Sequence, residues 1–453
     1  MSSAQALVRV GGPLDIYYQD SDNAKKQVIP TITDQRYTQE FNNKGQGTSV
    51  FTIPPNNGVS HVLLVMGYNA STVNDISGSF ALQRGWGYEA IQQVSFRVGG
   101  SSQYFLTGAQ LLARNLRLAR TQTQRDALLS LGGNVLYGSA TGPISTTQNQ
   151  LAYIPVSIWA QTGDDELNLP LPSDTLSQQI QVTVQLNPAY IASASPGTTP
   201  NTSGFWHLAT GASVANLTAP PAQFDTAYFQ VQQIQMKDRG MALANRVDLT
   251  KEMYSMALPG GFDQFEQTFQ LSSADATSQP QSVVLTGFRA GEVKSLQFFL
   301  QPNVIPGNSA TYDAAANPNL WYNPQNLQVL YAGLVYANYL NGSAPMWNLL
   351  NGTAPSAVNQ NVLTSAGGAW TAGSNPQLSQ WEMAPFAQPS GSDYEADVLV
   401  HGLEITNGIV NVSITPPPRS GVSAGVANAW TLHVVYNYNC ALGFSRGTAD
   451  LIF

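Results

Sequence analysis

The chain has 453 residues, a net charge of -8 and only 10% charged residues, together with 39 glycines and 27 prolines. This length exceeds that of one typical hydrophobic core, so two or more domains are expected. The acidic balance argues against sequence-specific nucleic-acid binding, which needs a basic face. The single cysteine, Cys440, excludes an intrachain disulfide.

A surface poor in charge is typical of a protein that lies largely against neighbouring subunits, although the composition fits a secreted β-protein equally well. The first residues lack a charged segment followed by a long apolar run, so we expect no signal peptide. No stretch approaches about 20 consecutive apolar residues, so no transmembrane helix is expected.

Short apolar or alternating runs bounded by Gly, Pro and Asn recur throughout and predict an all-β protein. In the first half the predicted strands are residues 49–53, 61–68, 91–98, 153–160, 179–186 and 227–236. In the second half they are residues 264–271, 282–286, 293–300, 327–335, 397–404, 409–414 and 430–438. Between the strands we predict long ordered loops at residues 189–221, 302–324 and 341–379.

One stretch of the first half predicts a helix, at about residues 107–130, with Thr107 as its N-cap. Its four arginines, Arg114, Arg117, Arg120 and Arg125, form either a basic contact surface or a solvated face, with Leu112 and Leu116 turned to the core. Residues 237–250 are polar and helix-prone. We therefore place a domain boundary there, with domains at 1–238 and 239–453.

Candidate catalytic and metal-binding residues are few. The histidines His61, His207, His401 and His433 are far apart in sequence, and those in strands fit a structural role better than metal ligation. Ser423 occupies the nucleophile position of a G-x-S-x-G motif at residues 421–425, but a Pro-rich loop precedes it, a strand follows it, and no acidic residue lies between it and His433, the only later histidine. The acidic residues 164–166 fit a polar loop better than a cation site. We therefore expect no enzyme, no catalytic or metal site and no cofactor.

Four stretches in the same order resemble the double jelly-roll major capsid proteins of nucleocytoplasmic large DNA viruses, virophages and tailless internal-membrane phages. They are IQQVSFRVGG at residues 91–100, YIPVSIWAQTGDDELNLPLPSDTLSQQIQVTVQL at 153–186, the strand ending in KDRG within 227–244, and WTLHVVYNYNCALGFSRGTADLIF at 430–453. A weaker match is FAQPSGSDY at residues 386–394. The helix after residue 107 and the long loops match no family residues.

This resemblance implies two tandem antiparallel eight-stranded jelly rolls with a short helical insertion and long loops. It also implies a major capsid protein that self-assembles as pseudo-hexagonal homotrimers tiling an icosahedral shell. The implied partners are further copies of the chain, penton and minor capsid proteins, and an internal membrane beneath the shell. The implied location is the virion, after synthesis inside the host cell. The alternative is a β-sandwich protein outside a shell, such as a viral spike, a carbohydrate-binding module or a glycosidase.

Three further expectations concern the termini and the loops. Residues 1–12 are expected to form an arm on a neighbouring subunit or on the inner face of the shell. The loops at 189–221 and 341–379 are expected on the outer surface or between lobes. Residues 451–453 are expected to turn back through Gly443 and Gly447 and to be buried against the second jelly roll or a neighbouring subunit.

Overall fold

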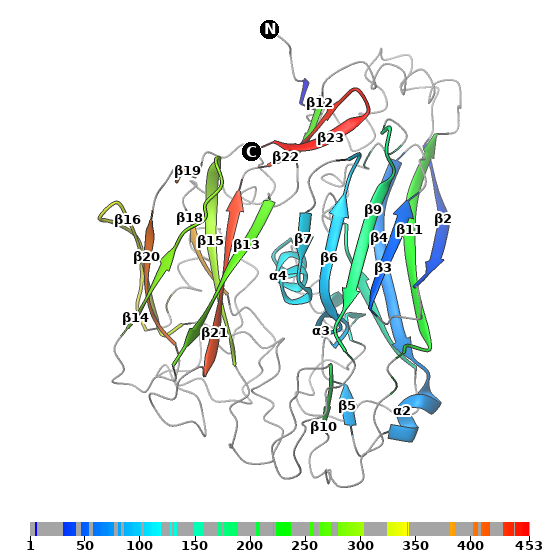
Figure 1. Cartoon of the computed structure of the whole chain (residues 1–453), viewed down its shortest axis with the longest axis horizontal. Coiled ribbons are helices and arrows are strands. Elements are labelled where there is room, and N and C mark those ends of the chain that lie inside the picture. Colours follow the sequence, from blue (N-terminus) through cyan, green and yellow to red (C-terminus); the bar gives the residue numbers. More distant parts are fainter. Residues whose placement is uncertain are drawn as a thin grey trace.

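A computed structural model of the chain describes residues 5–6, 30–41, 47–53, 58–76, 80–82, 86–100, 104–118, 127–128, 131–133, 149–157, 171, 173, 176–188, 205–208, 221, 223–236, 254–257, 262–272, 280–302, 324–341, 343, 381–385, 402–405, 409–416, 429–438 and 440–452. These residues form two β-sandwiches that lie side by side (Figure 1).

The first sandwich consists of two four-stranded sheets. Its strands are β2 (Pro30–Glu40), β3 (Thr48–Ile53), β4 (Gly58–Tyr68), β6 (Ile91–Arg97), β7 (Tyr104–Leu106), β8 (Gln150–Pro155), β9 (Ile180–Leu186) and β11 (Thr226–Met236). One sheet has the order β2-β11-β4-β8 and the other β3-β9-β6-β7. Every pair of neighbours within them is antiparallel.

The second sandwich repeats this plan. Its strands are β13 (Phe262–Leu271), β14 (Gln281–Leu285), β15 (Glu292–Pro302), β16 (Asn326–Tyr331), β17 (Leu334–Tyr339), β18 (Trp381–Pro385), β20 (Val410–Thr415) and β21 (Trp430–Tyr438). The sheets have the orders β13-β21-β15-β18 and β14-β20-β16-β17, and the short β19 (Leu403–Glu404) adds to β15. All of these pairs are antiparallel.

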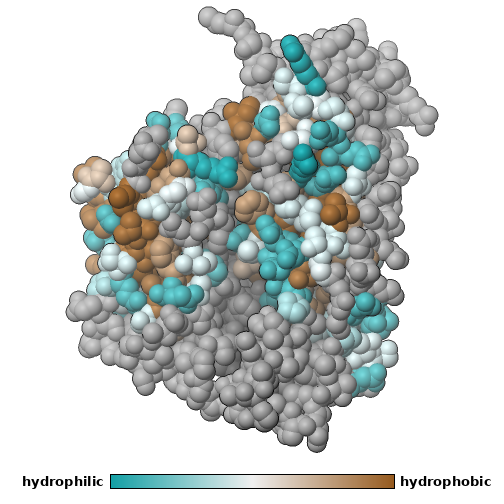
Figure 2. All heavy atoms as spheres, viewed as in Figure 1, coloured by the Kyte–Doolittle hydropathy of each residue, from teal (hydrophilic) through white to brown (hydrophobic). Residues whose placement is uncertain are grey.

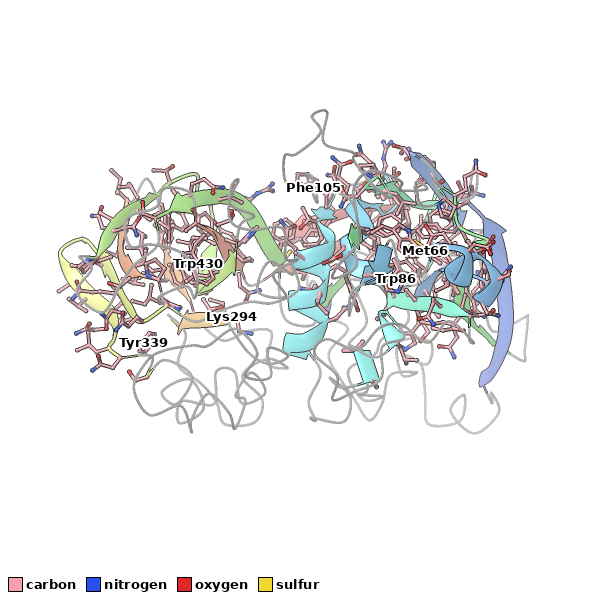
Figure 3. The ribbon with its side chains drawn as sticks, turned by 90° about the horizontal axis from the view of Figure 1, so that it is seen from below. Met66, Trp86, Phe105, Lys294, Tyr339 and Trp430 are labelled. Atoms are coloured by element: carbon pink, nitrogen blue, oxygen red, sulfur yellow. The ribbon has the colours of Figure 1, made fainter. Side chains whose placement is uncertain are left out.

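The strand order is the same in both sandwiches. If the eight main strands of each are counted along the chain, one sheet reads 1-8-3-6 and the other reads 2-7-4-5. First and last strands are neighbours, and each sheet alternates between early and late strands. This nested order of long returning connections is that of a jelly roll, which is built from two Greek keys. Figure 3, from below, shows the two barrels of strands next to each other, with a helix between them.

The remaining elements connect or cover the sandwiches. A third sheet has the order β1-β12-β22-β23 and is formed by β1 (Gln5–Ala6), β12 (Tyr254–Ala257), β22 (Ala441–Ser445) and β23 (Thr448–Ile452). Its β1–β12 pair is parallel. The strands β5 (Phe80–Leu82) and β10 (Trp206–Leu208) form a separate pair, and the helices are α2 (Ala70–Ile76), α3 (Trp86–Glu89) and α4 (Gly108–Leu118).

Alternation of apolar and polar residues explains why these segments are strands with one face in a core. In β9 the side chains of Ile180, Val182, Val184 and Leu186 are buried, as predicted, while the intervening Gln and Thr side chains are half-buried. In β21 the predicted inner face, from Trp430 to Tyr436, is buried as well. Side chains that alternate along a strand can fill the space between two packed sheets, so the pattern specifies a sandwich core.

The start of α4 confirms the predicted N-cap. The backbone N–H of Thr107 donates to Gln110 Oε1 at 2.7 Å, and the N–H of Gln110 faces Thr107 Oγ1 at 3.4 Å, which together make a capping box. Leu112 is buried as expected, but Arg114 is only 3% exposed, so neither a contact surface nor a solvated face describes this residue. The predicted remainder of the helix, from 119 to 130, lies largely outside the described residues.

Several strand boundaries differ from the sequence predictions. The predicted single strand at 327–335 is a hairpin, because Ala332 and Gly333 have φ of 50° and 79° and turn the chain between β16 and β17. The predicted strand at 153–160 is displaced to β8, and β2 and β18 lack a clear apolar alternation and were not predicted. Of the strand predicted at 397–404, only 402–404 is described. The predicted domain boundary at 238/239 lies outside the described residues and stays a prediction.

Candidate functional site

The sequence candidates for chemistry do not converge. The acidic residues 164–166, Ser423 and His401 lie outside the described residues. His61 is on β4 and His433 on β21, in different sandwiches, and His207 is on β10. Among the residues that the structure describes, no three His, Cys, Asp or Glu side chains gather closely enough to hold a metal ion. Nor does any described helix have the length and apolar character needed to cross a membrane.

Two groups that could carry acid–base or nucleophilic chemistry are held in their neutral forms. Burial lowers the pKa of His433 to about 4, so its ring is uncharged at neutral pH. Burial raises the pKa of the Cys440 thiol to about 12, an effect that the positive charges of Arg114 and Arg289 only partly offset. Because the thiolate is the nucleophile, a thiol with so high a pKa is unreactive at neutral pH.

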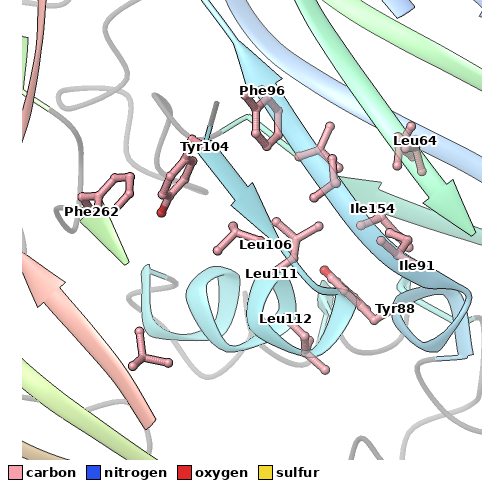
Figure 4. Packing of buried hydrophobic residues seen from close by; sticks show 14 of the residues in the cluster. Leu64, Tyr88, Ile91, Phe96, Tyr104, Leu106, Leu111, Leu112, Ile154 and Phe262 are labelled. Carbon is pink, nitrogen blue, oxygen red and sulfur yellow. The ribbon is translucent and has the colours of Figure 1, made fainter. Parts of the chain in front are cut away.

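The first functional feature is the junction between the sandwiches. The rings of Tyr104 on β7 and Phe262 on β13 lie 4.5 Å apart, and Figure 4 shows them facing each other across the gap between the sandwiches. Each ring has a guanidinium group near its face: Arg114 lies 6.0 Å from the Tyr104 ring centre and Arg289 lies 5.3 Å from that of Phe262. Cations over aromatic faces are attracted by the ring quadrupole, so each arginine supports the ring of its own sandwich, and the contact between the sandwiches is the Tyr104–Phe262 ring pair.

The helix α4 supports this junction from the first sandwich. Its own side chains Leu111 and Leu112 are buried, and the side-chain amide of Asn115 donates to the carbonyl oxygen of Pro155 at 3.0 Å and to Tyr88 Oη at 3.3 Å. These bonds fix the helix against β8 and α3, which in turn places Arg114 beside Tyr104. The insertion after β7 therefore lies between the sandwiches, as Figure 3 also shows.

The second feature is the C-terminal hairpin, β22–β23, which reaches back to the first sandwich. The backbone N–H and the hydroxyl of Ser177 both donate to the carbonyl oxygen of Gly447, at 2.7 and 2.8 Å. Nearby, Gly99 has a φ of +56°, and a Cβ added there would meet Leu176 and the backbone nitrogen of Ala449. The C-terminal hairpin is thus hydrogen-bonded to Ser177, which lies 270 positions before Gly447 in the chain.

The C-terminal residues differ in part from the sequence expectation. Gly443 lies within β22 and not in the turn, which is formed by Arg446 and Gly447 with φ of 49° and 82°. Leu451 packs against the core, whereas Ile452 is 52% exposed, so burial against the second sandwich is wrong for Ile452. Burial of this residue against a neighbouring subunit stays a prediction, and Phe453 lies outside the described residues.

The third feature is the outer sheet of the second sandwich, β14-β20-β16-β17, which we call the neutral sheet. Its four strands, all described, contain no Asp, Glu, Lys, Arg or His. Several large apolar side chains on or beside it are exposed, namely Val284, Leu334, Val335, Tyr336, Leu340 and Ile409. In Figure 2 brown apolar surface gathers over these strands, at the left of the molecule. Such a patch on a sheet indicates an interaction surface.

Comparison with known proteins gives matches to solved structures only. No family model and no curated protein matches the chain by sequence. Among solved structures, the capsid of the virus PBCV-1 matches with a TM-score of 0.58 at 11% identity, covering 94% of this chain and 96% of that one. The PBCV-1 protein VP54, fitted into a reconstruction of the virophage Sputnik, matches with a TM-score of 0.57 at 12% identity, covering 94% and 98%. This chain has the double jelly-roll fold.

A further double jelly-roll match supports the same assignment. The Faustovirus major capsid protein has a TM-score of 0.54 at 10% identity, covering 90% of this chain and 91% of that one. The fold resemblance indicated by the four sequence motifs is therefore confirmed over nearly the whole length. At these identities the matches establish the fold, and the function is argued separately below.

Sequence reasoning missed the junction and the neutral sheet. Tyr104 and Phe262 are single aromatic residues far apart in the chain, and no local pattern pairs them. The neutral sheet did leave a signal, because residues 324–343 contain no charged side chain in twenty positions. That signal was obscured because the hairpin within this segment was predicted as one strand.

Proposed function

We propose that this chain is the major capsid protein of an icosahedral virus. The observation that carries the proposal is the repeated strand order: two complete jelly rolls in one chain, placed side by side and joined at the Tyr104–Phe262 contact. The likeness in fold to the PBCV-1 and Faustovirus capsid proteins supports it. In this role the chain is a structural protein of the virion and not an enzyme, and it is made inside the host cell.

The proposed unit of assembly is a homotrimer. Two similar lobes in each chain give six lobes in a ring of three chains, and such a pseudo-hexagonal ring can tile flat facets. Permanent subunit contacts of this kind bury on the order of 2,000–5,000 Å² and are poor in charge. The low content of charged residues, 10%, fits that requirement.

The proposed domains and partners follow from this role. Residues 1–238 and 239–453 each form one lobe. Capsomers contact one another, penton proteins at the vertices and minor capsid proteins beneath the facets, with an internal membrane as a further partner. No sequence-specific contact to nucleic acid is proposed. Residues 1–12 act as an arm toward a neighbour, in addition to the parallel pairing of Gln5 and Ala6 with β12 in the same chain.

The test is the mass and shape of the purified full-length chain. Light scattering coupled to size-exclusion chromatography is expected to give three times the chain mass of 48.5 kDa, and electron microscopy is expected to show pseudo-hexagonal particles or shells. A spike, a carbohydrate-binding module or a glycosidase would give other shapes, and the last two would bind or cleave glycans. A monomer at all concentrations would contradict the proposal.

A further inference from the structure

We propose that the neutral sheet is the face of the second sandwich that another copy of this chain covers. This inference rests on the proposed self-assembly and adds to it the surface through which one subunit holds the next. The partner is a second copy of the chain. Two identical acidic chains repel each other, and this sheet has no charged residue in its strands, so it allows them to come into contact.

The first observation is a row of side chains that crosses the whole sheet and is apolar at three of its four positions. The backbone register places Val284 opposite Asn411, Asn411 opposite Leu330, and Leu330 opposite Val335, so these four side chains form one line over β14, β20, β16 and β17. Val284 is 45% exposed and Val335 is 53% exposed, and Leu330 between them is half-buried. The line therefore lies on the outer face, opposite the buried row of Val283, Val412 and Val329.

More apolar surface continues the row at the hairpin end. Leu334 is 63% exposed and begins β17, and Ile409, 56% exposed, directly precedes β20. Among the described strands β17 pairs with β16 alone, so this edge is also where a neighbouring chain can approach the backbone. A monomeric protein protects such an edge with charged side chains, and this sheet has none.

Charge identifies the partner. Each chain carries a net charge of -8, so two copies repel each other over most orientations. Each of the other sheets with four or more strands carries charged residues in its strands, for example Asp34 in β2, Arg97 in β6, Asp263 in β13 and Asp450 in β23. The neutral sheet is where an identical acidic molecule can make close contact without desolvating a charge. A basic partner would find no counter-charge here.

The hairpin geometry makes this face ready for docking. The turn residues Ala332 and Gly333, with φ of 50° and 79°, form a tight two-residue connection whose twist matches that of β16 and β17. Leu334 and Val335 are therefore presented by a hydrogen-bonded hairpin, and little conformational entropy is lost when a neighbour covers them. In a ring of three chains the contact is heterologous, so the next copy offers a different surface to this sheet.

Thiol labelling tests the inference directly. Cys440 is the only natural cysteine and is buried, so a new surface cysteine can be followed alone. Val335→Cys places a thiol on the neutral sheet, and Val50→Cys places one on β3 of the first sandwich, where the side chain is 44% exposed in the single chain. In the assembled protein we expect maleimide to modify Val335→Cys at least about tenfold more slowly than Val50→Cys, because reaction follows exposure of the thiol.

Charge insertion gives the second measurement. The double variant Val284→Lys/Val335→Lys is expected to shift the assembled protein to monomers in light scattering, while keeping its circular dichroism spectrum. The control, Val50→Lys, replaces a valine that is 44% exposed, against 45% for Val284 and 53% for Val335, and is expected to keep the assembly. Val335→Thr, which keeps the side-chain shape, is expected to weaken assembly less than the lysine variant.

The outcomes separate this inference from the proposed function. If the natural chain assembles but Val335→Cys is labelled as fast as Val50→Cys, or the lysine double variant still assembles, the neutral sheet is not the contact and the capsid proposal stands. Equal protection of both cysteines, or loss of assembly in Val50→Lys as well, also overturns the assignment to this sheet. If the natural chain is monomeric, both proposals fail.

Discussion

The aromatic ring of Tyr104, on β7 at the edge of the first jelly roll, lies 4.5 Å from that of Phe262, the first residue of the second jelly roll's first strand. Both residues are almost fully buried although they belong to different sandwiches. The two jelly rolls therefore share a small core of their own, and their relative position is fixed by packing.

Replacing Phe262 by alanine tests this shared core. The expected loss is about 3–5 kcal/mol in the free energy of unfolding, because a buried aromatic side chain leaves a cavity. Urea denaturation followed by fluorescence measures it, and the single transition of the natural chain is expected to broaden or split as the sandwiches uncouple. Phe269→Ala, on the same strand but only partly buried within the second sandwich, is the control. An equal loss in both variants, with no change in cooperativity, would argue against a coupling role for Phe262.

Alanine variants of two glycines in similar turns allow the cost of backbone strain to be separated from the cost of a disturbed contact. Gly333 and Gly447 have φ of +79° and +82°, but a Cβ added at Gly333 meets nothing within 4 Å, whereas one added at Gly447 meets Ser177 at 3.2 Å. Gly333→Ala is expected to cost about 1–2 kcal/mol from strain alone. Gly447→Ala is expected to cost more, since it also pushes the hairpin from the first sandwich. Thermal unfolding of the two variants gives the comparison, and equal losses would show that the hairpin contact is loose.

The hydroxyl of Ser177 makes a weaker contribution to the same contact. Ser177→Ala removes the donor to Gly447 O but leaves the backbone N–H bond to that oxygen, so we expect a loss of roughly 0.5–1 kcal/mol at this exposed position. Ser282→Ala, an exposed serine on β14, is the control and is expected to be close to neutral. Limited proteolysis at the C-terminus provides an independent measure: faster release of the terminal residues in Ser177→Ala alone is the expected result.

His433 predicts a specific pH dependence of stability. Its pKa is about 4 in the folded chain and about 6.5 when unfolded, so between these values the unfolded state binds more protons. Stability from this group is fully present above pH 6.5, decreases as the pH falls toward 4, and changes no further below that. The total is roughly 1–3 kcal/mol. The variant His433→Gln should have a shallower dependence between pH 4 and 6.5 in urea titrations. An unchanged slope would mean that other groups control stability in this range.

Much of the fold could be predicted from local patterns. Residues 179–186 and 430–438 alternate so regularly that their strands and buried faces were predicted nearly to the residue, because a side-chain period of two has one structural solution. Thr107 likewise marked the start of α4, since an N-cap is recognised within one turn of the helix. The resemblance of the four ordered motifs to the double jelly-roll capsid proteins predicted the paired jelly rolls.

The apolar content of the sequence could not show where β16 ends and β17 begins. Residues 327–335 are apolar except for Gln328, so their composition fits one long strand as well as two short ones. The reversal at Ala332 and Gly333 depends on positive φ at both residues, which alanine does not signal.

The sequence alone determined the all-β fold class and the low content of charged residues, because each depends on composition or on patterns only a few residues long. The paired jelly rolls were implied by the resemblance of four ordered motifs to the double jelly-roll capsid proteins. The tertiary structure decided which residues join the two jelly rolls, that Arg114 is buried beside Tyr104, that Ser177 holds the C-terminal hairpin, and that the neutral sheet faces outward. These contacts connect residues that are far apart in the chain. Their partners are chosen by how two finished sandwiches pack, and a local pattern contains no information about that packing.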